Sequence, residues 1–164
     1  MNEFGYEREL ARAYYKLLSA LDWQDDILIA GLREGLNKFL SNAYLSCFRG
    51  AHKYHKTHFV SLKALDKLQR KDYKGLVFEH LVPERNHLQK VCEERAAEGT
   101  LTIDFIEDLL KRYWWLATVT KEEDATIPKF TMPNDWDGKA ILARYESVNI
   151  KLVDNPFFSR PKRN

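Results

Sequence analysis

The sequence predicts a mostly helical domain that carries a small β-hairpin. Apolar residues recur at helical spacing along the first 48 residues. Two short runs rich in β-branched and aromatic residues, 76–82 and 113–119, stand apart among the helical segments. The second run leads directly into Thr120-Lys121-Glu122-Glu123, a capping box that marks the start of a helix. Together these patterns indicate an α+β fold in which helices dominate.

The composition fits one domain without a membrane span or a disulfide framework. The chain has 164 residues, of which 45% are apolar and 13% aromatic, enough for one core. No apolar run approaches the roughly 18 residues that a bilayer requires, and the N-terminus has no secretory pattern. The chain has only two cysteines, Cys47 and Cys92, and they lie far apart, which excludes a disulfide scaffold and a four-cysteine zinc site. We therefore expect reduced thiols, a cytoplasmic location and no structural zinc.

Residues 1–48 are expected to form an N-terminal helical hairpin. Its first helix covers residues 4–21, and its second is capped by Asp22 or Asp25 and runs to about Cys47. Gly31 and Gly35 lie four residues apart inside the second helix. They weaken the helix but allow a close neighbour.

Residues 49–74 form a basic segment inside an otherwise acidic chain. This segment carries 8 Lys and Arg against 2 Asp and Glu, whereas residues 75–159 carry 10 against 15. A short helix capped by Ser61 is expected over residues 61–70. The basic surplus fits phosphate binding, and a solvated helix face is the alternative.

Residues 75–127 contain the predicted hairpin. Gly75 precedes the first strand, and Pro83 ends it. A short helix is expected to start at Lys121 and to stop before Pro128. The remaining expectations for this single domain are inserted helices over 84–98 and 103–113, and a C-terminal region 128–164 with a last helix over 139–149.

Three polar side chains of this hairpin could carry chemistry. Glu79 and His80 lie in the first strand, and Asp124 lies in the first turn of the helix after the second strand. If the strands pair in antiparallel fashion, these side chains can converge. Two carboxylates suit Mg²⁺ or a similar divalent cation, which stabilises charge on a phosphate. A neutral imidazole can take a proton from the attacking water.

These residues resemble a nuclease signature. Glu79-His80-Leu81-Val82-Pro83 is similar to the acidic–His–aliphatic–x–Pro pattern of the HNH, or ββα-metal, nucleases. The resemblance implies a ββα-metal-like element with Glu79 and Asp124 as metal ligands and His80 as the general base. It also implies an endonuclease of the defence or toxin type that cleaves phosphodiesters of DNA or RNA. The sequence departs from the family because Asp124 replaces the usual His or Asn, because no cysteine pair is present, and because the insertion is long. Glu123 is an alternative ligand.

The basic segment supplies a second candidate site. Lysine and arginine side chains there could hold a nucleic-acid backbone beside the catalytic strand, which gives affinity without sequence choice. Three histidines at intervals of three could instead bind a transition metal or cover the core. The residues concerned are Arg49, His52, Lys53 and Lys56 for the nucleic acid, and His52, His55 and His58 for the metal.

A non-enzymatic interaction module is the other interpretation. It would be a degenerate nuclease or a helical protein of the immunity type that binds a macromolecular partner. Glu79 and His80 would then be a satisfied polar pair at a strand end. Asp124 would favour the positive end of its helix. The sequence therefore leaves a nucleic-acid partner and a protein partner open, and it predicts no membrane partner.

Overall fold

The computed structural model describes residues 5–161. The chain folds into two compact units, and each is built from segments distant in sequence. The helical unit contains the chain up to Arg49, the segment Glu84–Arg112 and the described residues from Arg160 onward. The sheet unit contains Gly50–Pro83 and Tyr113–Ser159. None of the helices in residues 5–161 combines the length and the apolar character that a membrane crossing requires.

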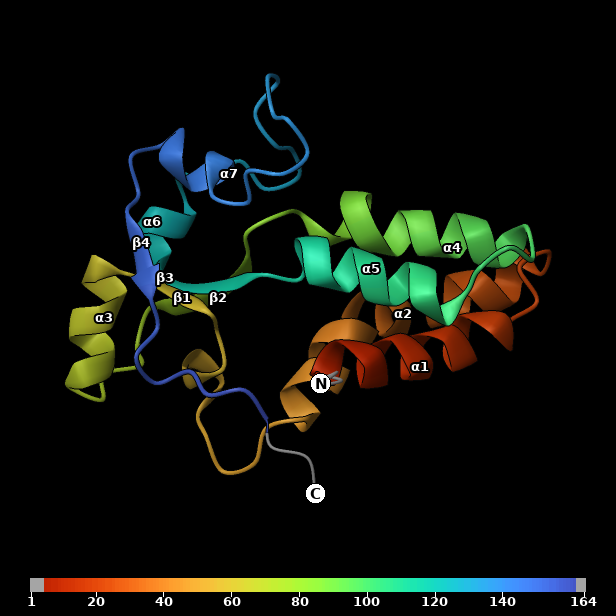
Figure 1. The fold of residues 1–164 in the computed structure, drawn as a ribbon, viewed down its shortest axis with the longest axis horizontal. Coiled ribbons are helices and arrows are strands. Elements are labelled where there is room, and N and C mark those ends of the chain that lie inside the picture. Colours follow the sequence, from red (N-terminus) through yellow and green to blue (C-terminus); the bar gives the residue numbers. More distant parts are fainter. Residues whose placement is uncertain (1–4, 162–164) are drawn as a thin grey trace. The chain divides into compact units, whose positions relative to one another are not determined.

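The helical unit confirms the predicted N-terminal hairpin and shows where the insertion belongs. The insertion packs with the N-terminal hairpin, because Glu84–Arg112 and the first helices form one compact unit. The first expected helix begins later than predicted, and residue 4 lies outside the described residues. The helices are α1 (Tyr6–Ser19), α2 (Asp26–Ser46), the π-helix η2 (Arg85–Gln89), α4 (Lys90–Ala97) and α5 (Ile103–Tyr113) (Figure 1).

Aromatic and aliphatic side chains fill the core of the helical unit. Tyr14 of α1 is fully buried and stacks on Phe39 of α2, with 5.7 Å between the ring centroids. Tyr6 and Tyr44 meet edge to face at 5.2 Å. Such large rings carry much of the burial energy of a small core. Cys92 is buried in the helical unit as a small apolar residue.

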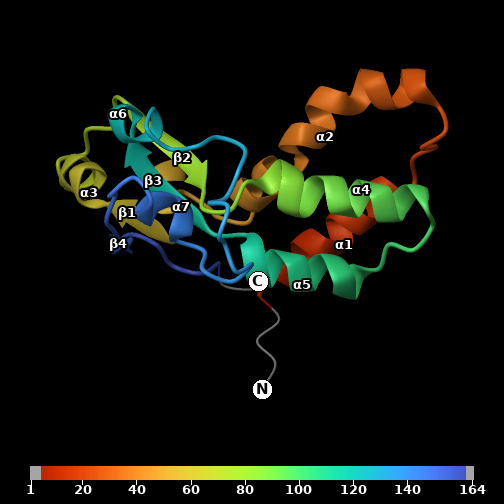
Figure 2. The ribbon, with the colours of Figure 1, turned by 90° about the horizontal axis from the view of Figure 1, so that it is seen from above.

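Polar side chains fix one face of α2. Arg33 donates through one terminal nitrogen to both carboxylate oxygens of Glu93 on α4, at 2.8 and 2.9 Å. Gln89 donates to Asn37 Oδ1 at 2.8 Å and to Glu93 Oε1 at 2.9 Å. The Asp25 carboxylate caps the helix by accepting from Leu28 N at 3.0 Å. In Figure 2, the first turns of α2 lie apart from α1 and α4.

A four-stranded mixed sheet organises the other unit, with the order β2-β3-β1-β4. The two expected strands pair in antiparallel fashion, as the hairpin hypothesis requires. Two further strands were not predicted, since each has only three residues and shows no alternating pattern. The strands are β1 (Phe59–Ser61), β2 (Leu76–His80), β3 (Leu116–Thr120) and β4 (Leu152–Asp154), with β1 parallel to β3 and β4 antiparallel to β1.

Short helices flank this sheet, and the predicted capping box is present. The Thr120 hydroxyl accepts from Glu123 N at 3.3 Å, and a Glu123 carboxylate oxygen accepts from Thr120 N at 2.9 Å. Ser61 donates to the same oxygen at 2.6 Å. The start of the helix after β3 is therefore fixed by local chemistry. The helices are η1 (Lys53–His55), α3 (Leu62–Gln69), α6 (Lys121–Asp124) and α7 (Ala143–Glu146).

The expected helix over 139–149 was wrong in length, because only α7 forms. Before it, the Asp137 carboxylate accepts from Lys139 N and Ala140 N, each at 2.8 Å, and holds a turn. After it, Asn149 has a φ of 58°, which ends the helix in the left-handed region. An Asp side chain that competes for backbone N–H groups is a recognised reason for such a turn.

Both faces of the sheet are covered, because separate apolar clusters lie against them. Val77 of β2 packs with a cluster that includes Leu81, Ala117 and Tyr145. Its neighbours Leu76 and Phe78 belong to a second cluster around Tyr54, Val60 and Leu68. All of β3 is buried, as a central strand with two covered faces should be. Alternate residues of β2 therefore face different surroundings.

Candidate functional site

The side chains of Glu79 and His80 lie on opposite faces of the sheet. Adjacent residues of a strand point in opposite directions, and β2 pairs regularly with β3 through both positions. Glu79 shares the face of Val77, whose cluster includes Tyr145. The His80 ring lies edge-on to Trp114, with 4.9 Å between centroids, and also meets the Phe78 ring at 6.1 Å. The regular strand therefore separates the two adjacent members of the predicted triad.

Glu79 and Asp124 lie close together. The negative charge of Asp124 contributes to raising the pKa of Glu79, and both charges act on the hydroxyl of Tyr145. β3 runs antiparallel to β2 and leads directly into α6 (Figure 1), and the electrostatic effect of Asp124 on Glu79 places the two acids near each other. The structure thus joins the two predicted ligands and leaves the predicted base on the other face.

A buried arginine occupies the centre of this site. The Arg144 side chain is fully buried. It donates to Glu79 Oε1 at 3.0 Å, to Leu81 O at 3.2 Å and to His80 O. It also donates to Pro128 O at 2.7 Å and to Lys129 O at 3.3 Å. The guanidinium therefore bonds to one carboxylate and four backbone carbonyls.

Asp124 also has a cationic partner. Lys129 Nζ lies 2.5 Å from Asp124 Oδ2 and donates to the Asp124 backbone oxygen at 3.1 Å. The other carboxylate oxygen, Oδ1, is buried without a hydrogen-bond partner among the described residues. Each of the two acids is therefore paired with a cation from the chain segment that follows α6.

Burial sets the electrostatics of Glu79. It raises the pKa of this carboxyl above its usual value, although the nearby Arg144 guanidinium partly offsets the effect. Burial also raises the pKa of Tyr145 well above its usual range. The site is thus poorly hydrated, and the interaction between Glu79 and Arg144 is stronger there than it would be in water.

Burial, together with the positive charge of Arg144, lowers the pKa of His80 to about 4. The Nε2 atom of the ring is buried. A general base works best when its pKa is near the working pH. As placed, His80 is a neutral aromatic partner of Trp114 and not a base poised near neutral pH.

The residues as placed do not fit a divalent cation. Mg²⁺ needs several oxygen ligands in octahedral geometry, and it competes poorly when carboxylates already hold cationic side chains. Arg144 and Lys129 bind Glu79 and Asp124 at 3.0 and 2.5 Å. Within residues 5–161, no group of three or more His, Cys, Asp and Glu side chains is arranged to hold a metal ion. A metal ion would compete with Arg144 and Lys129 for these two acids.

The candidate residues of the basic segment belong to different units and differ in exposure. Arg49 is exposed and belongs to the helical unit, whereas His52, Lys53 and Lys56 belong to the sheet unit. His52 stacks on Tyr73 at 3.9 Å, and its side chain accepts from Tyr54 N at the start of η1. Lys53 is exposed, but Lys56 is buried. His52 and Lys53 thus remain available at the surface, and Lys56 does not.

The three histidines of this segment have separate roles. His52 and His55 have ring centroids 6.2 Å apart, and His55 stacks on Phe157 at 4.6 Å. His58 is buried and accepts from Leu116 N at 3.1 Å through Nδ1. His58 is thus bound to the backbone of β3, which leaves it unsuited to share a metal with the other two.

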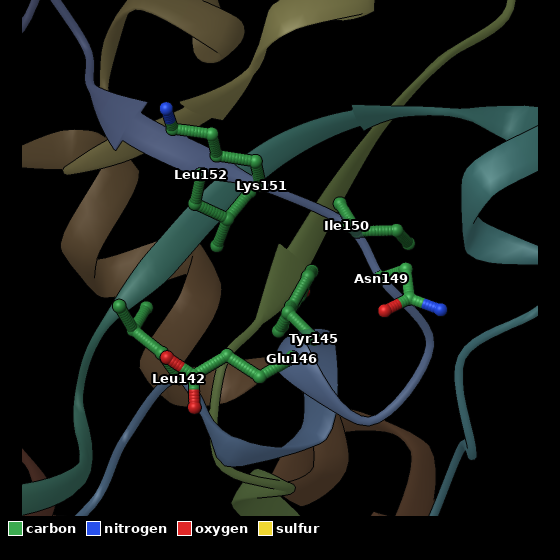
Figure 3. Close-up of a pocket in the computed structure, with 7 residues that line it drawn as sticks. All are labelled: Leu142, Tyr145, Glu146, Asn149, Ile150, Lys151 and Leu152. Atoms are coloured by element: carbon green, nitrogen blue, oxygen red, sulfur yellow. The ribbon is translucent and has the colours of Figure 1, made fainter.

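A pocket of about 330 Å³ lies beside the site. Figure 3 shows that its lining comes from the α7 region and from the segment that leads into β4. Neither Glu79 nor Asp124 lines it, so the pocket and the paired acids are separate features. Its lining residues are Leu142, Tyr145, Glu146, Asn149, Ile150, Lys151 and Leu152.

Sequence reasoning did not find Arg144 or Lys129. Neither stands in a motif, and an arginine in an expected amphipathic helix is ordinarily solvated. Comparisons with models of known protein families, with curated proteins and with solved structures found no match. The geometry of the site is therefore the basis for a functional interpretation.

Replacing Arg144 with methionine should destabilise the protein strongly. Arg144→Met leaves the partly buried Glu79 carboxylate without its cation, and such a loss at a buried pair costs about 3–5 kcal/mol. Adding Glu79→Gln should recover part of the loss, since the uncompensated charge is then gone. Chemical denaturation of the single and double variants measures both effects.

Lys129→Met is the matched control for that experiment. Lys129 also pairs with an acid, but its side chain is 45% exposed. Exposed ion pairs contribute about 0–1 kcal/mol. If Arg144→Met costs no more than Lys129→Met, the buried pair does not hold this part of the structure.

Protonation of His80 should lower the free energy of unfolding at acid pH. The folded protein keeps this ring neutral down to about pH 4, whereas the unfolded chain protonates it near 6.5. The free energy of unfolding should thus be fully retained above pH 6.5 and should fall as the pH drops towards 4. The His80→Phe variant should show a smaller fall. Because other histidines also titrate there, the test is the difference between the two curves, and parallel curves would contradict it.

Proposed function

We propose that the chain is a non-catalytic interaction module that binds a partner protein in the cytoplasm through an apolar face of α2. We call this face the α2 strip, and its members are Ile27, Leu28, Gly31, Leu32 and Gly35. The observation that carries the proposal is the exposure of large aliphatic side chains. Ile27 is 87% exposed, and Leu28 and Leu32 are each 38% exposed. Contiguous exposed apolar residues are typical of protein interaction surfaces.

The strip lies on the side of α2 away from its anchors. Residues three and four apart share one helix face, so Leu28, Leu32 and Gly35 line up. Arg33 and Asn37, which hold α2 to the neighbouring helices, project in roughly the opposite direction. The strip is therefore presented by an anchored helix and requires little ordering on binding.

The sheet unit supports the non-catalytic interpretation. The two candidate ligands, Glu79 and Asp124, are bound to cationic side chains, and His80 packs on Trp114 on the other face. The donors of the buried Arg144 are all bound to oxygens of the protein, as a structural role requires. On this proposal, the ββα-like element is a scaffold.

Removing aliphatic side chains from the strip should weaken partner binding. Burial of each side chain contributes about 1.5–3 kcal/mol, so Ile27→Ser with Leu32→Ser should weaken binding by roughly tenfold or more. The measurement is quantitative affinity purification from cells of the source organism, followed by calorimetry with the purified partner.

Ala30→Ser with Asn42→Ser is the control, because both residues are exposed on the same helix outside the strip. Equal melting curves for both variants would show that folding is intact. The proposal requires a protein retained by the wild type and the control and lost by the strip variant. Identical retention profiles for all three would rule out the α2 strip as the binding surface.

A metal-dependent nuclease is the second candidate function. The order of two antiparallel strands and a helix, with Glu79 and Asp124 on one side, supports it. The buried Asp124 Oδ1, which has no hydrogen-bond partner among the described residues, is a further supporting observation. His52 and Lys53 would contact nucleic acid. In this candidate, the metal ion competes with Arg144 and Lys129 for the two acids.

Incubation with plasmid and with total RNA, each with Mg²⁺ or Mn²⁺, distinguishes the two candidates. The interaction module should leave both substrates intact. Cleavage by the wild type that is lost in Asp124→Asn and in His80→Ala would instead support the nuclease. Cleavage that persists in both variants would indicate a contaminating activity.

A further inference from the structure

The α2 strip has an alternating pattern of large and small residues. Leucines and glycines alternate along it, since Leu28 is followed by Gly31 and Leu32, and then by Gly35. All four residues are exposed. A Cβ added at either glycine would meet nothing within 4 Å, so both positions are open notches in the helix surface. Helices approach one another most closely where the contacting side chains are small.

An antiparallel second copy of α2 complements this pattern. If a two-fold axis passes between Gly31 and Leu32, Leu28 of one copy is level with Gly35 of the other. Leu32 is then level with Gly31 of the other copy. Each projecting leucine is thus level with a notch in the other helix, and a two-fold interface requires such self-complementarity.

The charges on α2 favour the same alignment. Its N-terminal end is acidic, with Asp25 as the cap and Asp26 in the first turn. Lys38 lies further along the helix, is 62% exposed and pairs with Glu34. The antiparallel alignment places Asp25 of one copy level with Lys38 of the other. A parallel alignment would bring like charges level with one another, which is unfavourable.

We propose that the α2 strip binds a second copy of this chain, in an antiparallel pair of α2 helices centred between Gly31 and Leu32. This inference rests on the proposed function, since it names the partner that the strip takes. The pair is closed because both copies use the same surface. The exposed aliphatic side chains are buried in the pair.

Substituting the two glycines with leucine distinguishes an effect on dimerisation from an effect on folding. Gly31→Leu with Gly35→Leu should weaken self-association at least tenfold, because the leucines of the other copy lose their space. The same substitutions should raise the stability of the helix, since leucine has a better helix propensity than glycine. Sedimentation equilibrium over a wide range of concentrations measures association. Thermal unfolding confirms that the loss does not come from unfolding.

Cysteine crosslinking tests the direction of the pair. In a background with Cys47→Ser and Cys92→Ala, Leu32→Cys should crosslink readily because the two positions 32 are about 1.5 Å apart along the axis. Ile27→Cys should crosslink poorly because the two positions 27 are about 13 Å apart along the axis. A parallel pair would crosslink at both positions.

The outcomes separate this inference from the proposed function. A wild type that stays monomeric at every concentration, or a dimer that the glycine substitutions do not weaken, overturns the antiparallel pair. Equal crosslinking at both positions also overturns it. If the protein is monomeric but a strip-dependent partner is captured, the proposed function stands and the second copy is excluded. If neither is found, both fail.

Discussion

Arg144 couples parts of the sheet unit that are distant in sequence. Its guanidinium binds the end of β2 through the oxygens of His80 and Leu81, and it binds the turn after α6 through those of Pro128 and Lys129. A buried guanidinium is tolerated only when its donors are satisfied, so these segments must reach their places together. Glu79 supplies the compensating charge. Arg144 thus adds a polar link between α7 and the end of β2 to the apolar contacts that Tyr145 makes in the same unit.

Local signals in the sequence were sufficient for most of the helices and for the antiparallel hairpin. The capping box at Thr120 is the clearest case, since its hydrogen bonds involve only neighbouring residues. The strands β1 and β4 could not be found in this way, because they are short and are stabilised by pairing with distant partners. The last helix was predicted too long because Asp137 binds the backbone ahead of it. In each of these failures, the deciding interaction was tertiary or involved a side chain that competes with the helix.

The candidate site shows how a motif and strand geometry can disagree. The adjacent residues Glu79 and His80 suggested a shared function, yet a regular strand points them to opposite faces. This consequence follows from the sequence once the strand is accepted as regular. Arg144 and Lys129 could not have been inferred, because their roles arise only when the C-terminal region folds back on the hairpin. Arg144 and Lys129 pair with these two acids, and the surface that we propose for recognition lies on a helix of the other unit.

The path of the chain through the two units has a consequence for dissecting the molecule. The helical unit takes its described segments from residues 5–49, 84–112 and 160–161, so the backbone passes between the units several times. No single cut can therefore release an intact half, and a fragment that begins at residue 50 would lack α1 and α2 while keeping α4 and α5. The loop between β2 and β3 is itself a pair of helices whose packing partners lie upstream. Truncation mapping assumes that each module is a contiguous segment. In this chain a truncated fragment would lose activity because a unit no longer folds, and not because a functional residue was removed.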